Sequence, residues 1–379
     1  MSKPLSYYGY YVNERVDSNT LTTKNYIGVD NLMPNRGGVV DSEYVPIEGT
    51  STAFKKGDLL IGNIRPYFKK IWLATFDGGC SPDVLCIRPN GKMISECLFA
   101  VLSQDTFFDY TMAGSKGSKM PRGDKNHIMA FPIPEVKGQE IIGNFTTNLY
   151  EKISINNKIN TELESMANTL YEYWFLQFEF PNEEGRPYKS SGGRMVWSEE
   201  LKREIPEGWE TRQIGDILIE SDKSKIQVNE AKEKGDFPFF TSGESILAYH
   251  EFLVDGFNIF LNTGGNPDIK AYKGKCAYST DTWCVSAKQY SYILYHYLLK
   301  LMPQFEQLFF AGSGLKHLQK DALKSKLILI PDNKILKSFN LSCSSIWEKI
   351  SNCSIQILEL TSLRDFLLPI LMNGQVTFK

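Results

Sequence analysis

The chain has 379 residues, and at about 150 residues per domain this length predicts two or three domains, each large enough to bury its own core. Hydrophobic residues make up 42% and charged residues 23%, which excludes disordered, collagen-like and membrane classes of protein. The 42 Lys and Arg against 44 Asp and Glu give a net charge of −2, which excludes a strongly basic DNA-coating protein but not locally basic faces. No cationic, apolar leader opens the sequence and no apolar stretch reaches the ~20 residues of a membrane span, so we expect a cytoplasmic protein without a membrane partner.

Residues 1–137 carry the pattern of a compact, mainly β domain with a few helices. They are rich in Tyr, Phe, Ile, Thr and Gly, and their short alternating runs are separated by turn signals such as Asp77-Gly78-Gly79 and Asn90-Gly91. We therefore expect a first globular domain at 1–137.

A long helix is predicted over residues 138–178. Hydrophobic residues recur every seven positions in two series, one counted from Ile142 and one from Phe145, and no proline or glycine interrupts residues 144–180. Such a pattern is typical of a coiled coil. The predicted seam, meaning the stripe that faces a partner helix, contains Leu149, Ile159, Leu163 and Leu170.

A linker and a second globular domain follow this helix. Residues 179–206 are polar and rich in Gly, Pro and Ser, which predicts a linker. Residues 207–331 repeat the composition of the first domain, with Gly264-Gly265-Asn266-Pro267 as a turn signal, and predict a second mainly β domain.

The last segment, 332–379, is predicted to be a second long helix with a C-terminal tail. Its heptad series start at Leu336 and Phe339, and its predicted seam contains Ile350, Ile357, Leu360 and Leu367. At 1.5 Å per residue, helices of about 35 to 40 residues are roughly 50 to 60 Å long. The linker can return along the first helix, so the two seams are expected to pair in one chain as an antiparallel coiled coil. The predicted fold class is α+β, with two mainly β domains separated by two long helices.

An internal repeat supports this organisation. Residues 57–63 resemble residues 256–262 at an offset of 199, and Gly114-Ser115 matches Gly312-Ser313 at an offset of 198. A β-like run that ends in proline closes each unit at Pro134 and Pro331, an offset of 197. The nearly constant offset predicts a pseudo-twofold molecule built from one unit repeated twice.

Residues that would carry catalysis or bind metal are not grouped in this sequence. There is no phosphate-binding G-x-x-x-x-G-K-[ST] loop and no dinucleotide-binding G-x-G-x-x-G. The four histidines lack metal-ligand spacing, and the seven cysteines contain no C-x-x-C pair, so we interpret them as structural. We expect no catalytic residues, no metal and no cofactor.

Positive charge gathers instead in loops at matching positions of the two repeats. Glycines let the backbone approach an anion closely, and the neighbouring asparagines and arginine suit base edges, so these loops predict contacts with double-stranded DNA. A merely solvated loop is the alternative for each cluster taken alone. The predicted DNA-binding residues are Asn63, Arg65, Lys69, Lys70, Ser115, Lys116, Lys119 and Arg122 in the first domain, and Asn262, Asn266, Lys270, Lys273, Ser313, Lys316 and Lys320 in the second.

Several phrases, in this order along nearly the whole chain, resemble the specificity (S) subunit of Type I restriction-modification systems. The resemblance is carried by residues 57–66, 79–83, 132–139, 174–181, 205–209 and 367–376. It implies that 1–137 and 207–331 are target recognition domains, each of which reads half of an asymmetric bipartite site. The second domain lacks the arginine and proline of Asn63-Ile-Arg-Pro66, so no base contact is transferred from one half to the other.

The resemblance also implies partners. The helices at 138–178 and 332–379 would set the distance between the half-sites and dock two methyltransferase (M) subunits, and restriction (R) subunits would join the full complex. Methylation and cleavage would belong to those partners, which agrees with a non-catalytic chain. A protein-interaction scaffold without DNA readout is the alternative function.

Overall fold

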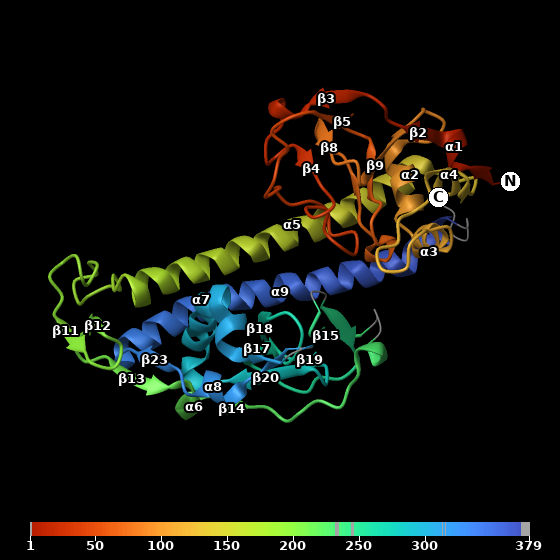
Figure 1. The fold of residues 1–379 in the computed structure, drawn as a ribbon. Coiled ribbons are helices and arrows are strands. Elements are labelled where there is room, and N and C mark those ends of the chain that lie inside the picture. Colours follow the sequence, from red (N-terminus) through yellow and green to blue (C-terminus); the bar gives the residue numbers. More distant parts are fainter. Residues whose placement is uncertain (1, 232–234, 244–245, 313, 315, 373–379) are drawn as a thin grey trace. The chain divides into compact units, whose positions relative to one another are not determined.

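The computed structural model describes residues 2–231, 235–243, 246–312, 314 and 316–372 (Figure 1). Two compact units are present: unit 1 contains Met1–Asn157 and Glu359–Lys379, and unit 2 contains Lys158–Leu358. Two long helices, α5 (Gln139–Tyr171) and α9 (Asn333–Met372), each contribute residues to both units. Each unit is described below by itself.

Unit 1 contains two four-stranded sheets. The first is antiparallel and has the order β2 (Gly9–Tyr11), β9 (Val84–Pro89), β6 (Leu59–Gly62), β7 (Ile71–Leu73). The second has the order β3 (Arg15–Asp17), β5 (Thr50–Phe54), β8 (Gly78–Cys80), β4 (Tyr26–Ile27), and only its β4–β8 pair is parallel.

Short helices and one small strand pair complete unit 1. The strands β1 (Lys3–Pro4) and β10 (Pro132–Ile133) pair with each other. The helices are α1 (Leu5–Tyr8), α2 (Ser95–Leu102), α3 (Asp105–Ala113) and α4 (Lys125–Met129), with 3-10 turns η1 (Ser18–Thr20) and η2 (Pro66–Phe68). The larger core of the unit joins β6, β9, α2 and α3 to the ends of α5 and α9, for example through Leu98, Ile142 and Leu368.

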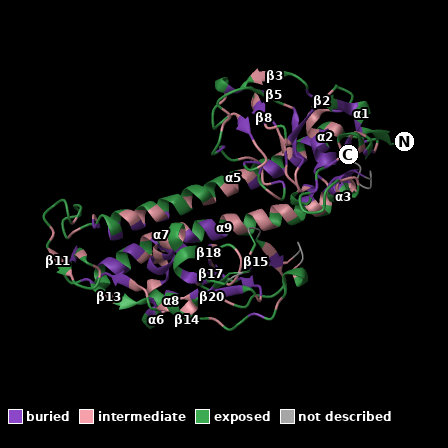
Figure 2. Ribbon diagram, in the orientation of Figure 1, coloured by how far each residue is buried: buried purple, intermediate pink, exposed green. Residues whose placement is uncertain are grey.

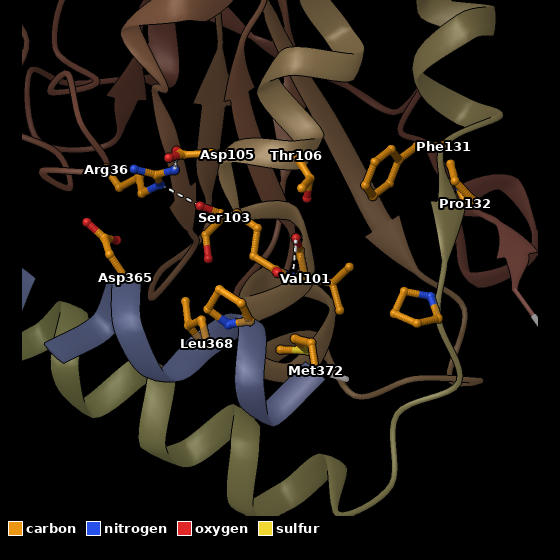
Figure 3. A pocket seen from close by; sticks show the side chains of 13 residues that line it. Arg36, Val101, Ser103, Asp105, Thr106, Phe131, Pro132, Asp365, Leu368 and Met372 are labelled. Carbon is orange, nitrogen blue, oxygen red and sulfur yellow. Dashed lines mark hydrogen bonds and ion pairs between the residues drawn. The ribbon is translucent and has the colours of Figure 1, made fainter. Parts of the chain in front are cut away.

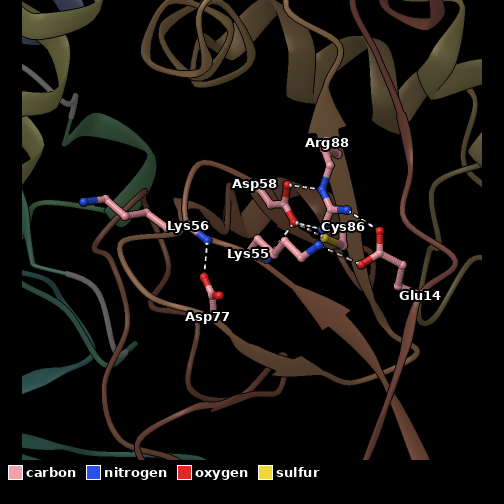
Figure 4. A network of polar contacts seen from close by, with 7 residues as sticks. All are labelled: Glu14, Lys55, Lys56, Asp58, Asp77, Cys86 and Arg88. Atoms are coloured by element: carbon pink, nitrogen blue, oxygen red, sulfur yellow. Dashed lines mark hydrogen bonds and ion pairs between the residues drawn. The ribbon is translucent and has the colours of Figure 1, made fainter.

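A network of polar contacts ties the first sheet of unit 1 to its neighbours (Figure 4). The Arg88 guanidinium donates to both carboxylate oxygens of Asp58 at 2.8 Å, and the Asp58 side chain is only 3% exposed. Asp58 also accepts from the Lys55 N–H at 2.8 Å, and Arg88 continues outward to Glu14. A bidentate arginine–carboxylate pair of this kind satisfies a carboxylate that would otherwise be buried alone, so it fixes β6 against β9.

Unit 2 repeats the first sheet in the same strand order. Its four-stranded sheet runs β14 (Ile219–Glu220), β20 (Thr282–Ser286), β17 (Phe257–Asn262), β18 (Ile269–Lys273) and is antiparallel. The repeated sequence segments therefore form the third strand in both sheets, β6 and β17. Unit 2 also contains a three-stranded sheet with the order β16 (Leu247–Tyr249), β15 (Phe237–Phe240), β19 (Ala277–Tyr278). Like the second sheet of unit 1, it has one parallel pair, here β15–β19.

The remaining elements of unit 2 are two-stranded pairs and helices. The pairs are β13 (Glu210–Gln213) with β23 (Leu327–Ile330), β11 (Met195–Ser198) with β12 (Arg203–Pro206), and β21 (Phe310–Ala311) with β22 (His317–Leu318). The helices are α6 (Ile214–Ile217), α7 (Ser291–Phe309) and α8 (Lys320–Lys324), with 3-10 turns η4 (Val228–Glu230) and η5 (Lys288–Tyr290). The expectation of mainly β domains is thus too narrow, because helices and small sheets are mixed in both units.

The segment 179–206, predicted as a linker, is folded as part of unit 2. A π-helical turn, η3 (Glu172–Leu176), follows α5, and Phe178 then adopts a left-handed backbone conformation with φ of 62°. Phe180 and Ile205, the latter on β12 of the β11–β12 hairpin, are buried in the same core as Trp209. Aromatic and aliphatic residues spaced along a polar stretch therefore anchor it to the unit.

The two long helices pack against each other in an antiparallel direction within each unit. In unit 2, Tyr171 near the end of α5 contacts Phe339 near the start of α9, and Asn160 donates to the Ser354 hydroxyl at 3.2 Å. In unit 1, the earlier residue Tyr150 lies under the Arg364 guanidinium, 5.4 Å from the ring centre. Sequence order therefore rises along α5 while it falls along α9.

Both long helices carry buried, half-buried and exposed residues along their length (Figure 2), and on α5 only one of the two predicted heptad series is covered throughout. On α5 the series that contains Leu149 is buried or half-buried, but the predicted seam residue Ile159 is 40% exposed, as are Met166 and Tyr173 of its series at 57% and 38%. The second covered position lies four residues after the first, where Thr146, Ile153 and Ala167 are buried and Asn160 is half-buried.

On the helix α9 both predicted series are buried or half-buried. Ile350 of the first series and Phe339 of the second are buried, while Ile357, Leu360 and Leu367 are half-buried. Trp347 and Leu368, each four residues after a residue of the first series, are also buried. The predicted assignment of Ile159 to the seam was wrong because apolar residues occur on both sides of the first series, and spacing alone does not distinguish a step of three from a step of four.

Two neighbouring residues of α5 provide a matched test of the corrected seam. Ala167 is fully buried, so Ala167→Glu places a carboxylate in a packed helix pair, and we expect a loss of about 3 kcal/mol or more in the free energy of unfolding. Met166→Glu lies 100° around the helix on an exposed face and should change stability by less than about 0.5 kcal/mol. Chemical denaturation followed by circular dichroism measures both, and equal effects would contradict the corrected seam.

Candidate nucleic-acid interface

Two loops of unit 1 that are about sixty residues apart in sequence are joined by backbone hydrogen bonds. We call residues 63–69, after β6, and 115–124, after α3, the first loop pair. Ile64 and Arg122 form an isolated antiparallel bridge, and the Arg65 N–H donates to the Pro121 carbonyl at 2.8 Å. The Gly123 N–H reaches the Asn63 carbonyl at 3.3 Å. Residues predicted separately as DNA contacts are therefore brought together.

Unit 2 joins the corresponding loops in the same way. We call residues 262–268, after β17, and 316–320 the second loop pair. Gly264 and His317 form an isolated antiparallel bridge, the Leu318 N–H donates to the Thr263 carbonyl at 3.0 Å, and the Gly265 N–H donates to the Lys316 carbonyl at 3.1 Å. Two different sequences thus build the same backbone junction at the end of the same strand.

Exposed cations lie on residues 115–124, the second segment of the first loop pair. Lys116 is 83% exposed and pairs with Asp124 at 2.9 Å, and Arg122 is 58% exposed and pairs with Asp83 at 3.2 Å. The His127 N–H and the Lys116 ammonium hold the pKa of the Asp124 carboxyl at about 2. Lys119 is also exposed, and within the described chain no carboxylate forms an ion pair with it. Exposed ion pairs contribute only about 0 to 1 kcal/mol, so these cations can exchange a carboxylate for a phosphate.

Three other predicted contacts of unit 1 hold the loops in place. The Lys69 ammonium pairs with Asp105 at 2.8 Å and is 18% exposed, and Lys70 donates to the Val29 carbonyl at 2.7 Å. The Ser115 hydroxyl donates to the Met112 carbonyl at 2.8 Å, where it satisfies the end of α3. These contacts engage Lys69, Lys70 and Ser115 within unit 1, and their contact with DNA stays a prediction.

The polar residues of the second loop pair are also engaged with their own unit. The Asn262 amide donates to the Ser242 and Asn266 carbonyls at 2.8 and 3.0 Å, so it shapes the turn that carries Asn266. Lys270 pairs with Asp268 and is 16% exposed. Asn262 and Lys270 therefore support the loop, and the exposed Asn266 is the polar group left at its tip.

Two cations of the second loop pair remain accessible at the surface. Lys316 is 47% exposed and pairs with Glu306, and Lys320 is 40% exposed and pairs with Glu220 at 3.3 Å. Lys320 also lies over the Trp283 ring at 4.5 Å. Hydrogen bonds from Lys324, Trp283 and Lys320 lower the pKa of Glu220 to about 2, so this carboxylate is charged at neutral pH.

Lys273, another predicted contact, is engaged within unit 2, and one predicted residue is not described. The Lys273 ammonium donates to the Ser344 hydroxyl at 2.7 Å and pairs with Glu348, both on α9. This lysine therefore holds β18 against α9 within unit 2. Ser313 lies outside the described residues.

No sequence pattern indicates the pocket of unit 1 that lies between α3 and the end of α9 (Figure 3). It has a volume of about 380 Å³ and is lined by residues that include Arg36, Asp105, Asp365 and Met372. Arg36 is 4% exposed and reaches both the Ser103 carbonyl and Asp105. Arg36 follows a Pro-Asn turn, and only its tertiary partners, 67 and 69 residues away, reveal its role.

The remaining chemistry of the described chain is structural. His296 is buried without a hydrogen-bond partner for either ring nitrogen, and burial lowers its pKa to about 3, so it is a neutral core side chain as interpreted. Six cysteines are buried and Cys353 is half-buried. Among the described residues, no group of three His, Cys, Asp or Glu side chains is arranged to hold a metal ion. The described helices include none with the length and apolarity needed to cross a membrane.

Comparisons with known proteins agree with the repeated architecture. The family model described as the Type I restriction modification DNA specificity domain matches residues 206–353. Over 94% of its length the chain is 27% identical to the Type I restriction enzyme MjaIX specificity subunit of Methanocaldococcus jannaschii, of which 86% is covered. It is 23% identical to the HindI specificity subunit of Haemophilus influenzae, over 90% of this chain and 93% of that protein.

The fold comparison gives the same result. The crystal structure of the S subunit of a Type I restriction-modification system from M. genitalium superposes with a TM-score of 0.57 at 13% identity, covering 98% of this chain and 95% of that one. Residues 206–353 thus match the Type I restriction modification DNA specificity domain, and the chain is similar to Type I specificity subunits along nearly its whole length. The resemblance stated from the sequence is therefore confirmed.

The exposed cations of the first loop pair predict that the chain contacts DNA phosphates. We expect Lys119→Ala to weaken binding to all duplexes about equally and to lower the slope of log affinity against log salt by about one unit. Lys56→Ala, which removes an exposed lysine of unit 1 outside the loop pair, is the matched control and should leave the slope unchanged. Fluorescence anisotropy of the assembled complex at several salt concentrations gives the slope, and an unchanged slope for Lys119→Ala would show that this loop stays in solvent.

Proposed function

We propose that this chain is the non-catalytic DNA-reading subunit of a Type I restriction-modification complex, in which units 1 and 2 each read one half of an asymmetric bipartite site on double-stranded DNA. The observation that supports this most directly is the repeated junction between two loops at the end of β6 and of β17. The same backbone arrangement carries different side chains in the two units, as expected for two readers of different sequences.

The long helices are proposed to set the distance between the two half-sites. The 33 residues of α5 and 40 residues of α9 correspond to continuous helices of about 50 and 60 Å. Half-sites read by paired domains are separated by about one helical turn of DNA, ~34 to 36 Å, or by a multiple of it. Because the α5–α9 pair has a packed interior in both units, it is suited to act as a stiff spacer.

The helices are also proposed to dock two M subunits, with R subunits joining the full complex. In unit 2, an exposed apolar stripe runs along α5 into the π-helical turn η3. It consists of Ile159, Met166 and Tyr173, whose side chains are 40%, 57% and 38% exposed. Apolar residues at heptad spacing that the described residues leave partly exposed fit a partner helix. Adenine methylation and DNA cleavage are assigned to those partners.

Methylome sequencing tests the proposed function. Cells that express this chain together with the M subunit encoded beside it should show a split adenine motif, and cells that lack this chain should lose that motif alone. If the methylation pattern does not change, the chain does not direct DNA recognition. Binding of the assembled complex to protein partners without any sequence preference on DNA would instead favour an interaction scaffold.

The proposed docking stripe makes a second prediction. The double variant Ile159→Glu, Met166→Glu places charges in the interface with the M subunit, and we expect association to weaken about tenfold or more because desolvated apolar contacts dominate such interfaces. The matched control is Ser165→Glu, an exposed position 100° around α5 from Met166. Analytical ultracentrifugation of the chain with its M subunit measures the affinity. Unchanged association of the double variant would place the interface elsewhere.

A further inference from the structure

The loop that carries Arg65 is held in a strained conformation. Seven non-glycine residues of the described chain have positive φ, and four of them, Asn35, Arg36, Arg65 and Lys69, lie on two segments that hydrogen-bond to each other. The Asn35 N–H donates to the Phe68 carbonyl at 2.8 Å, and the Arg36 N–H donates to the Lys69 carbonyl at 3.0 Å. A left-handed residue other than glycine costs about 1 to 2 kcal/mol, and such residues gather at ligand sites, where the surrounding structure maintains them.

The Arg65 side chain has no partner among the described residues, and unlike the exposed Lys119 it is half-buried. Lys69, Lys70, Lys116 and Arg122 each contact a carboxylate or a carbonyl. The Arg65 guanidinium has no hydrogen-bond acceptor among the described residues, and its Nε atom is buried. Leaving a buried donor unsatisfied costs about 1 to 3 kcal/mol, more for a charged group, so this arginine is poised for an acceptor from outside the chain.

A second buried polar atom lies close to Arg65 in the chain. The Asn63 side chain is 9% exposed, and its Oδ1 atom has no hydrogen-bond partner within the described residues. Gly123 packs tightly beside it, because a Cβ at Gly123 would lie 2.8 Å from Asn63 Oδ1. The end of β6 therefore presents an unsatisfied acceptor and an unsatisfied donor two residues apart.

The chemistry of the surrounding cleft indicates which ligand Arg65 takes. Arg65 lines a cleft of about 690 Å³ in unit 1, together with exposed Tyr44 and Met120 and with carboxylates that include Asp30, Glu43 and Asp83. These carboxylates repel a phosphate, so an anionic ligand is disfavoured inside the cleft. The edge of a base is neutral, and the O6 and N7 acceptors of guanine match the paired donors of a guanidinium.

Unit 2 has no counterpart of this site. Its corresponding segment after β17 is Asn262-Thr263-Gly264-Gly265-Asn266-Pro267, which contains no arginine. The Asn262 side chain is satisfied within the loop, unlike Asn63. The two units therefore cannot read the same base in the same way.

We propose that Arg65 is a specificity-determining residue of unit 1, which contacts a guanine in the major groove of the half-site that this unit reads. The proposal rests on the proposed DNA-reading function and adds one base and one side chain to it. Cations outside the cleft, Lys116, Lys119 and Arg122, are left to contact phosphates, while the strained backbone holds Arg65 in place for the base.

Two substitutions of Arg65 test the proposal. Arg65→Gly removes the guanidinium and tolerates positive φ without strain, and Arg65→Lys keeps the charge but removes the paired donors. In the assembled complex with its M subunit, both variants should lose about 5- to 150-fold discrimination at one guanine of one half-site, measured by selection from a randomised duplex library. The other half-site should be unchanged, and thermal unfolding should show that both variants fold.

Arg122→Ala is the matched control, since it removes an exposed arginine of the same loop pair. It should weaken binding to all sequences about equally. If Arg65→Lys keeps full discrimination at the guanine, or if Arg65→Gly weakens binding to all sequences alike, Arg65 contacts phosphate and the proposal is overturned. A unit 1 half-site without a G·C pair also overturns it while the DNA-reading function stands, whereas a wild-type complex with no sequence preference would overturn the proposed function itself.

Discussion

The candidate interface depends on a short backbone junction that occurs once in each unit. In unit 1 it joins Ile64 to Arg122, and in unit 2 it joins Gly264 to His317. These bonds bring a loop that leaves the third strand of the sheet against a loop that follows a helix. Because main-chain groups make the junction, the side chains on both loops can change without loss of the geometry. This property suits a family whose members must read different sequences on one scaffold.

The long helices illustrate how far a heptad pattern can be interpreted. The pattern predicted two long helices, and the series through Leu149 and Leu163 lies on the inner face as expected. On α5 the second series was placed one residue too early, because Ile159 and Met166 are apolar but exposed, whereas Asn160 is half-buried and Ala167 is buried. Burial of small and polar residues between two helices leaves no clear hydropathy signal. The misassigned residues Ile159 and Met166 are the exposed apolar residues that we propose as a docking surface for a partner subunit.

For the site, the sequence predicted which loops carry charge but not which charges are available. The repeat located both loop pairs, since their anchors have a nearly constant offset. The partners that engage Lys69 and Lys273 are Asp105 and Glu348, which are 36 and 75 residues away and become neighbours only after folding. The left-handed conformation of Arg65 was equally unpredictable, because glycine and asparagine signal such a conformation and arginine does not. Long-range pairing therefore determines which lysines are held by carboxylates of the same unit. It also determines which arginine is left without a partner for the proposed base contact.

The division of the chain has a consequence for its synthesis. Unit 2 is formed by one continuous stretch, Lys158–Leu358, while unit 1 needs residues from both sides of it. Leu368, Leu371 and Met372 belong to the same core as Leu5 and Phe99, so the first 157 residues leave the ribosome well before the turns of helix that cover them. The nascent N-terminal segment keeps an uncovered apolar face until the last turns of α9 have been made, and products truncated before those turns would keep that face open to aggregation or to chaperones.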